Sequence, residues 1–180
     1  MKRALPLALI LMVLPLAALA HSWTVDATQS TLGFDGSFQG GAFHGVFKRF
    51  DSDIRYEPAD LADARFDVTI DLASVDTQAS ERDETLRGAD FFDVAHTPKA
   101  HFVTRAFHRA ADGSVTAEGT LELHGHSQPV TLAVQFKPTA GGATLDVSTT
   151  LDRLDFGLGT SSDWADISKR IGVRGHLVLK

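Results

Sequence analysis

The sequence predicts an all-β fold of about eight antiparallel strands, arranged as a sandwich or a closed barrel. Apolar and polar residues alternate one by one through most of the chain, as they do in strands with one buried face. Turn signals such as Asp112-Gly113 and Gly141-Gly142 separate the alternating runs. Residues 80–98 break the alternation, which indicates a short helical segment between strands.

The alternating runs place the strands in order along the chain. In the run RFDVTIDL, every second residue from Phe66 to Leu72 is apolar and the residues between them are polar. Strands are expected near residues 22–27, 31–38, 43–56, 65–72, 99–109, 114–123, 129–137, 143–151 and 173–180. The connections between most of these runs are short, so neighbouring strands are expected to pair antiparallel.

The segment that interrupts the alternation predicts a helix of two turns. Ser80 fits an N-cap with Asp83 at the N3 position, and Gly88 stands where a helix is expected to end. Phe91 and Phe92 follow as a pair before the next strand. Two turns cannot form a core of their own, so the segment is either a lid across an open barrel end or a crossover that fills space between strands.

The first twenty residues predict a cleaved secretory signal peptide. Lys2 and Arg3 are followed by an apolar run, and Ala18-Leu19-Ala20 fits the small-x-small rule for signal peptidase. The apolar run is short for a membrane anchor and contains two prolines. A single mature domain over residues 21–180, exported to the periplasm, is therefore expected.

Composition narrows the range of partners and chemistries. Removing the two basic residues of the signal changes the formal net charge from −6 to −8, and such a surface repels nucleic acid. The chain has no cysteine, which excludes disulfides and thiol chemistry. The single tyrosine and two tryptophans do not provide the aromatic girdles of an outer-membrane barrel.

Residues 82–102 resemble the signature of the YceI-like family, whose members are lipid- or polyisoprenoid-binding proteins. The matching positions are Arg82-Asp83, Leu86, Asp90-Phe91-Phe92-Asp93, Pro98 and Phe102, with further agreement at Trp23-Thr24-Val25-Asp26, Gly45-Val46-Phe47 with Phe50, His124-Gly125 with Pro129-Val130, and Asp155-Phe156-Gly157. The resemblance covers residues 22–180 in order. It departs at Thr85, where many relatives carry His, and at the short segment 158–171, which is typical of the compact secreted branch.

The resemblance implies a lipocalin-like closed antiparallel β-barrel with a short helical cap between strands. It also implies a long isoprenoid or acyl chain in an apolar lumen, no cofactor other than this lipid, and a membrane b-type cytochrome as a possible partner. A homodimer is possible. Small residues on the apolar faces, such as Gly119 and Gly175, either leave space for a ligand or mark close packing where strands bend.

Alternation and resemblance together define the candidate ligand-binding residues. The expected lumen and cap set is Phe34, Phe66, Val68, Ile70, Phe91, Phe92, Phe102, Leu121, Leu132, Val134, Leu145 and Val147. Arg82 is the candidate contact for the polar head of the ligand, or else it forms an ion pair with Asp83, Asp90 or Asp93. A register error of one residue would turn a whole strand to the other face.

Metal binding and catalysis are the alternatives to a binding role. His124 and His126 form an H-x-H pair, and a mature N-terminus at His21 could chelate copper, but such short patterns are weak signals and no metal site is expected. The sequence contains no nucleophile elbow, HExxH, phosphate loop or GxGxxG. We therefore expect a non-catalytic periplasmic carrier of a polyprenyl or quinone-type lipid, the alternative being a metal-binding or small hydrolytic protein that uses surface His and Asp residues.

Overall fold

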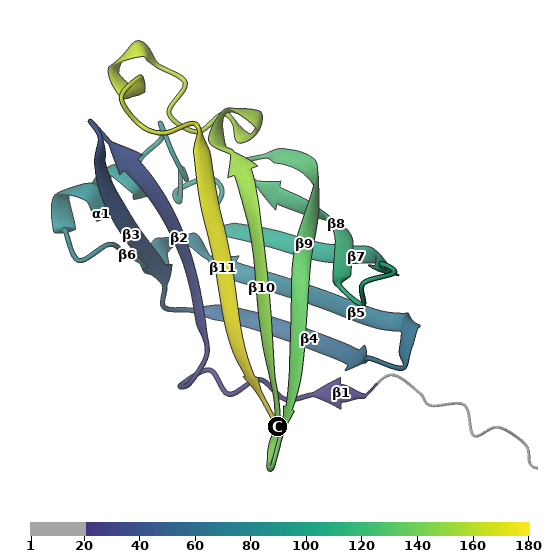
Figure 1. Cartoon of the computed structure of the whole chain (residues 1–180). Helices are drawn as coiled ribbons and strands as arrows, with labels where there is room; N and C mark the ends of the chain where they lie inside the picture. Colours follow the sequence, from purple (N-terminus) through teal and green to yellow (C-terminus); the bar gives the residue numbers. More distant parts are fainter. Residues whose placement is uncertain (1–20) are drawn as a thin grey trace, which may run out of the picture.

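The computed structural model describes residues 21–180, and the expected signal peptide, residues 1–20, lies outside the described residues. Eleven strands form one antiparallel sheet in the order β1-β4-β5-β7-β8-β9-β10-β11-β2-β3-β6. The strands are β1 (Ser22–Trp23), β2 (Thr31–Phe38), β3 (Gly41–Phe47), β4 (Phe50–Glu57), β5 (Asp60–Asp71), β6 (Val75–Asp76), β7 (Lys99–Arg109), β8 (Val115–Leu123), β9 (His126–Thr139), β10 (Gly142–Asp152) and β11 (Arg170–Leu179). Figure 1 shows the sheet curling so that β2, β11, β10 and β9 cross over β4, β5 and β7.

The lipocalin-like antiparallel fold expected from the sequence is confirmed, but the sheet is a half-barrel rather than a closed ring. Within residues 21–180 the strand order begins at β1 and ends at β6. The N-terminal segment joins the two sides at one end. There β1 pairs with β4, and Thr24 and Lys180 exchange two backbone hydrogen bonds of 2.9 Å next to β11.

Residues 21–180 form eleven strands where nine alternating runs were expected, because the predicted strand 43–56 is two strands, β3 and β4, and the two-residue strand β6 was not predicted. The chain leaves β2 after Val46 and joins β5 at Phe50. Between them, the Lys48 and Arg49 N–H groups donate to the backbone oxygen and the hydroxyl of Ser74, respectively. These bonds replace the strand-to-strand hydrogen bonds that Lys48 and Arg49 lack where the chain changes direction. The alternation of apolar and polar residues does not indicate this corner.

The inner face of the sheet holds two apolar clusters, which lie at different positions along the strands. The solid cluster is Ile54, Tyr56, Phe66, Val115, Ala117, Val134, Ala143, Leu145, Leu177 and Leu179. The cavity cluster is Phe34, Leu72, Val75, Phe91, Phe92, Ala100, Phe102, Leu121, Leu123, Val130, Phe156 and Leu158. A strand advances about 3.3 Å per residue, so a single strand such as β8 contributes Val115 to one cluster and Leu123 to the other.

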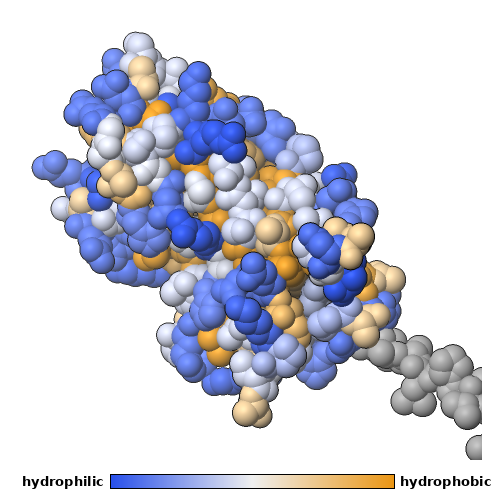
Figure 2. Space-filling model, viewed as in Figure 1, coloured by the Kyte–Doolittle hydropathy of each residue, from blue (hydrophilic) through white to orange (hydrophobic). Residues whose placement is uncertain are grey.

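The small inward residues mark close packing and leave no extra space. The ring of Phe102 lies against Gly119, where an added Cβ would come within 2.6 Å of the ring. At Gly175, an added Cβ would come within 2.9 Å of a Val147 methyl group. The outer surface is mainly hydrophilic in the view of Figure 2, with hydrophobic residues in small patches between polar ones. No helix within residues 21–180 is long and apolar enough to cross a membrane.

Two non-strand segments cover the end of the half-barrel that holds the cavity cluster. The first cap is residues 77–98 and contains α1 (Ser80–Arg87), and the second cap is residues 153–169 and contains the 3-10 helices η2 (Arg153–Phe156) and η3 (Ser162–Trp164). Figure 1 shows α1 beside β3, and the second cap beyond the ends of β10 and β11.

The first cap begins and ends differently from the sequence prediction. Ala79 is the N-cap and makes no side-chain capping bond, so Ser80 is the first helical residue rather than the cap. Gly88 is the C-cap, but its backbone is extended rather than left-handed. The Asp83 carboxylate instead accepts hydrogen bonds from the N–H and hydroxyl of Thr77, at 2.8 and 2.6 Å, which fixes α1 to the turn before it.

The second cap is organised by the buried side chain of Arg153, which is 5% exposed. Its guanidinium donates to five backbone carbonyls, those of Leu158, Gly159, Trp164, Ile167 and Ser168, at distances of 2.6 to 3.3 Å. Burial lowers the pKa of Arg153, and the neighbouring Asp152 partly opposes this effect. One side chain therefore satisfies five carbonyls spread over residues 158–168 of the second cap.

Replacing Arg153 with Met should detach the second cap. A buried polar group left without a partner costs roughly 1–3 kcal/mol, so the freed carbonyls should turn to water and the segment should open. We expect amide hydrogen exchange to accelerate in residues 158–169 while β8 to β11 stay protected. Arg170→Met is the matched control, because Arg170 is exposed. Slow exchange of 158–169 in Arg153→Met would contradict this role.

Candidate ligand-binding cavity

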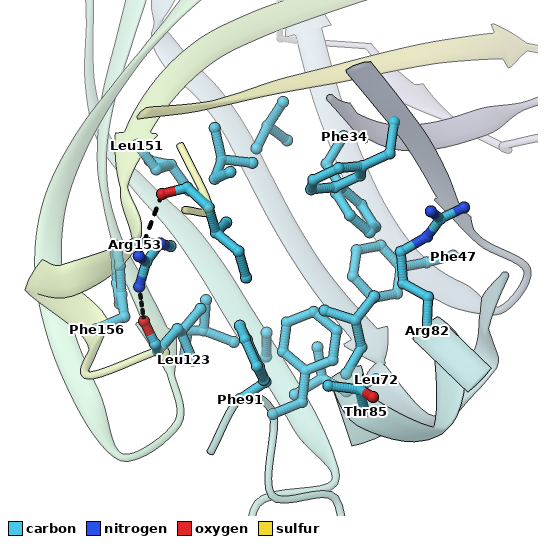
Figure 3. A pocket seen from close by; sticks show the side chains of 18 of the residues that line it. Phe34, Phe47, Leu72, Arg82, Thr85, Phe91, Leu123, Leu151, Arg153 and Phe156 are labelled. Atoms are coloured by element: carbon cyan, nitrogen blue, oxygen red, sulfur yellow. Dashed lines mark hydrogen bonds between the residues drawn. The ribbon is translucent and has the colours of Figure 1, made fainter. Parts of the chain in front are cut away.

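A cavity of about 480 Å³ lies between the inner face of the half-barrel and the two caps. Of its 25 lining residues, only Glu81, Arg82, Thr85 and Arg153 are polar. The others are Leu32, Phe34, Phe38, Phe43, Phe47, Ile70, Leu72, Ala79, Leu86, Phe91, Phe92, Ala100, Leu121, Leu123, Leu151, Phe156, Leu158, Trp164, Ile167, Ile171 and Val173. Figure 3 shows side chains from strands and caps converging on this space.

Aromatic rings connect the sheet to both caps. Phe47 lies 5.4 Å from Phe34 and 5.7 Å from Phe92, measured between ring centroids, which links β2 and β3 to the first cap. Phe91 packs edge-on against Trp164 at 5.0 Å, and the Trp164 indole N–H donates to Asp90 at 3.0 Å. The two caps therefore hold each other in place as well as covering the barrel.

The cavity stays open at β2 and β3 because two rings lie along the sheet. Phe34 packs over Gly45, its partner on β3, and Phe43 packs over Gly36, its partner on β2. An added Cβ on Gly36 would come within 2.6 Å of the Phe43 ring. With a larger residue at either glycine, the phenylalanine ring above it would have to rotate away from the sheet and into the cavity.

Exposed residues among the lining show where the cavity meets solvent. Phe38, at the end of β2, is 43% exposed, and Glu81, in the first turn of α1, is also exposed. Phe91 and Phe92 are only 4% and 7% exposed. The opening therefore lies between α1 and the end of β2, and the paired phenylalanines form an inner wall.

Arg82 is fixed at this side of the cavity by a hydrogen-bond chain. Its Nε donates to the Thr77 hydroxyl at 2.8 Å and its Nη2 to the Thr77 carbonyl at 2.9 Å. The Thr77 hydroxyl in turn donates to Asp83. Arg82 thus forms no direct ion pair with the three carboxylates considered from the sequence, and its guanidinium carbon lies 5.5 Å from the centre of the Phe43 ring.

The structure divides the sequence-derived site residues into two groups. Six of them line the cavity: Phe34, Ile70, Arg82, Phe91, Phe92 and Leu121. Seven do not: Phe66, Val68, Phe102, Leu132, Val134, Leu145 and Val147. Phe102 belongs to the cavity cluster but covers Gly119, Leu132 packs against both clusters, and the other five belong to the solid cluster or pack against it. These five face inward as expected but lie at the filled end, since alternation specifies the face of a strand and not the position along it.

The second cap was not predicted from the sequence. Phe156, Leu158, Trp164 and Ile167 line the cavity from this segment. Residues 153–169 break the alternation in the same way as residues 80–98, so this break was the available signal. From the sequence, this region is singled out only for the Asp155-Phe156-Gly157 resemblance and for the shortness of residues 158–171.

The histidines considered as metal ligands lie outside the cavity lining. His124 begins the turn between β8 and β9, where its Nδ1 contacts the Phe156 carbonyl at 3.1 Å, and its ring centroid lies 6.2 Å from that of His126. His101 lies 2.7 Å from Asp67, and this contact together with Arg65 holds the pKa of Asp67 below its usual range. Within residues 21–180, no three potential ligand side chains converge.

The YceI-like domain family matches residues 23–179. A UPF0312 protein of Vibrio vulnificus is 31% identical over 165 residues, which cover 85% of this chain and 87% of that protein. Among solved structures, Burkholderia cenocepacia BcnA is similar, with a TM-score of 0.81 and 26% identity over 86% of this chain and 98% of BcnA. A polyisoprenoid-binding domain from Saccharophagus degradans shares the fold, with a TM-score of 0.64 and 22% identity over 91% of this chain and 99% of that domain.

Gly45→Ala should reduce the space in the cavity with a limited loss of stability. The new Cβ would meet the Phe34 ring and come within 2.9 Å of a Thr77 methyl group, so the ring should shift inward. Overpacking of this kind costs about 1–3 kcal/mol. We expect weaker binding of an apolar fluorescent probe, with the fold confirmed by denaturant melts. Gly141→Ala is the control, because an added Cβ there has no neighbour within 4 Å. Equal probe binding by the two variants would show that Phe34 does not limit the cavity.

Proposed function

This chain belongs to the YceI-like family, and from that premise we propose that it is a non-catalytic periplasmic carrier of a long-chain isoprenoid lipid of the polyprenyl or quinone type. The observation that carries the proposal is the cavity itself. Its volume of about 480 Å³ lies in the range of ligand sites, and 21 of its 25 lining residues are apolar. A cavity with such a lining favours an apolar chain over a polar metabolite.

The shape of the site also supports a chain-like ligand. The cavity extends from the exposed side, at Phe38 and Glu81, to residues on β8, β10 and the second cap such as Leu123, Leu151 and Leu158. An apolar tail in this space would be removed from water at about 25 cal/mol per Å². The Saccharophagus degradans domain with the same fold is described as polyisoprenoid-binding, which supports an isoprenoid as the ligand class.

The polar groups of the cavity favour binding over catalysis. They comprise two guanidiniums, one exposed carboxylate and the Thr85 hydroxyl, and no histidine. That hydroxyl donates to the Glu81 backbone carbonyl of its own helix at 2.9 Å, and within residues 21–180 it has no hydrogen bond to a carboxylate or imidazole. This arrangement lacks the paired nucleophile and general base of a hydrolytic site.

Location and partners complete the proposal. Export to the periplasm rests on residues 1–20, and association with a membrane b-type cytochrome rests on the family resemblance. A homodimer is compatible with this function, because one protomer contains the whole cavity.

Organic extraction of protein purified from a periplasmic fraction, followed by mass spectrometry, tests the function directly. A long-chain isoprenoid in near-stoichiometric amount is the expected result. Protein that is recovered folded from that fraction and yields only trace lipid would contradict a carrier role.

The double change Phe91→Ala, Phe92→Ala should weaken ligand retention more than it lowers the stability of lipid-stripped protein. These rings wall an open cavity, whereas Phe66 lies in the solid cluster. Phe66→Ala is therefore the matched control and should cost roughly 3–5 kcal/mol without changing ligand affinity in the folded fraction. The measurements are denaturant melts of stripped protein and lipid titrations of both variants.

The opposite pattern would exclude a ligand-binding role for the paired phenylalanines. In that case the double variant would unfold when stripped of lipid, and any folded fraction would bind lipid as tightly as the wild type.

A further inference from the structure

The cavity contains two guanidinium groups without direct carboxylate partners. None of the ion pairs within residues 21–180 includes Arg82 or Arg153. The one carboxylate in the lining belongs to Glu81, which is exposed to solvent. The lining residues have a formal charge of +1, from two arginines and Glu81. Behind the lining, Asp83 is linked to Arg82 through the Thr77 hydroxyl, and Asp152 lies near Arg153.

The two arginines differ in the hydrogen-bonding capacity that remains. Arg153 donates from all three nitrogens to backbone carbonyls, so it contributes charge but no obvious vacant donor. Arg82 donates from Nε and Nη2 to Thr77, and its Nη1 has no acceptor among the described residues. A guanidinium has five N–H donors, so Arg82 can still bind an oxygen-rich group.

The position of Arg82 suits the polar end of an amphiphile. Its side chain is half-buried and next to the exposed Glu81, on the side where the cavity meets solvent. Thr77 and the buried Asp83 hold the guanidinium in place before any ligand arrives. Figure 3 shows Arg82 and Arg153 on opposite sides of the cavity. An apolar tail that fills the space between them would therefore place its polar head at one of these two sides.

We propose that the lipid carried by this protein has an anionic head group with carboxylate or phosphate oxygens, and that Arg82 binds this head group. The inference rests on the proposed carrier function and specifies its ligand. The oxygens of an anion would accept from the Arg82 Nη1 group, which has no acceptor among the described residues, in a charge-assisted hydrogen bond. A neutral alcohol or quinone head lacks the charge, and an ammonium head would be repelled.

The test compares four ligands that share one tail: palmitate, hexadecyl phosphate, hexadecanol and hexadecylamine. Each is titrated below its aggregation threshold into lipid-stripped wild type, Arg82→Met and Arg87→Met. Arg87 is the matched control. It lies on the same helix and donates to the Ala73 and Val75 carbonyls, but it does not line the cavity.

The wild type should bind the two anionic ligands about tenfold or more tightly than hexadecanol, as expected for a hydrogen bond to a charged group. Hexadecylamine should bind weakest. Arg82→Met should lose most of this preference while its hexadecanol affinity stays the same, and Arg87→Met should keep the preference.

Wild type that binds hexadecanol as tightly as palmitate would overturn the inference, and this comparison does not depend on any variant folding. An undiminished preference in folded Arg82→Met would also overturn it. Binding of hexadecanol without a preference for anions overturns the head-group inference and leaves the carrier function intact. Failure of all four ligands would also overturn the head-group inference, whereas the carrier function is decided separately by the lipid extraction described above.

Discussion

The cavity depends on one buried guanidinium. A half-barrel leaves one end of its inner face uncovered, and a connecting segment can cover that end only if its backbone polar groups find partners. Arg153 supplies these partners by donating to five carbonyls between Leu158 and Ser168. With the second cap fixed in this way, Trp164 can reach Phe91 and Asp90, which joins it to the first cap. Space between the caps and the sheet then remains enclosed without being filled.

The inner face has a filled end and an open end, so a single strand contributes residues both to the solid cluster and to the cavity lining. Residues such as Leu145 and Leu177 belong with Tyr56 to the solid cluster. Residues further along the same strands, such as Leu151 and Val173, line the cavity. Close packing at one end can therefore stabilise the sheet while the other end stays available to a ligand. The glycines under Phe34 and Phe43 extend this arrangement to β2 and β3, since they let large rings lie along the wall.

Much of the fold could be predicted because strand alternation is a local property. The inward faces of β8, β10 and β11 and the helix at Ser80–Arg87 agree with the sequence analysis. The corner at Lys48 and Arg49, the open edge of the sheet and the height of each inward residue depend on contacts distant in sequence, so the pattern could not specify them. The same limit explains why Phe66 and Leu145 were expected in the lumen. Arg153 was missed because a single arginine among charged and apolar residues gives no sign that it will be buried.

Paramagnetic broadening can locate a bound tail, and it tests most directly whether the ligand lies at the open end of the half-barrel. A fatty acid with a spin label near its methyl end is added to lipid-stripped protein, and methyl signals are recorded by NMR with a diamagnetic ligand as reference. We expect strong broadening of Leu123, Leu151 and Val173, which line the cavity, and sharp signals for Leu145, Leu177 and Leu179 in the solid cluster. Equal broadening of both sets, or broadening confined to the solid cluster, would contradict the claim that one end of this half-barrel holds the ligand and the other forms the core.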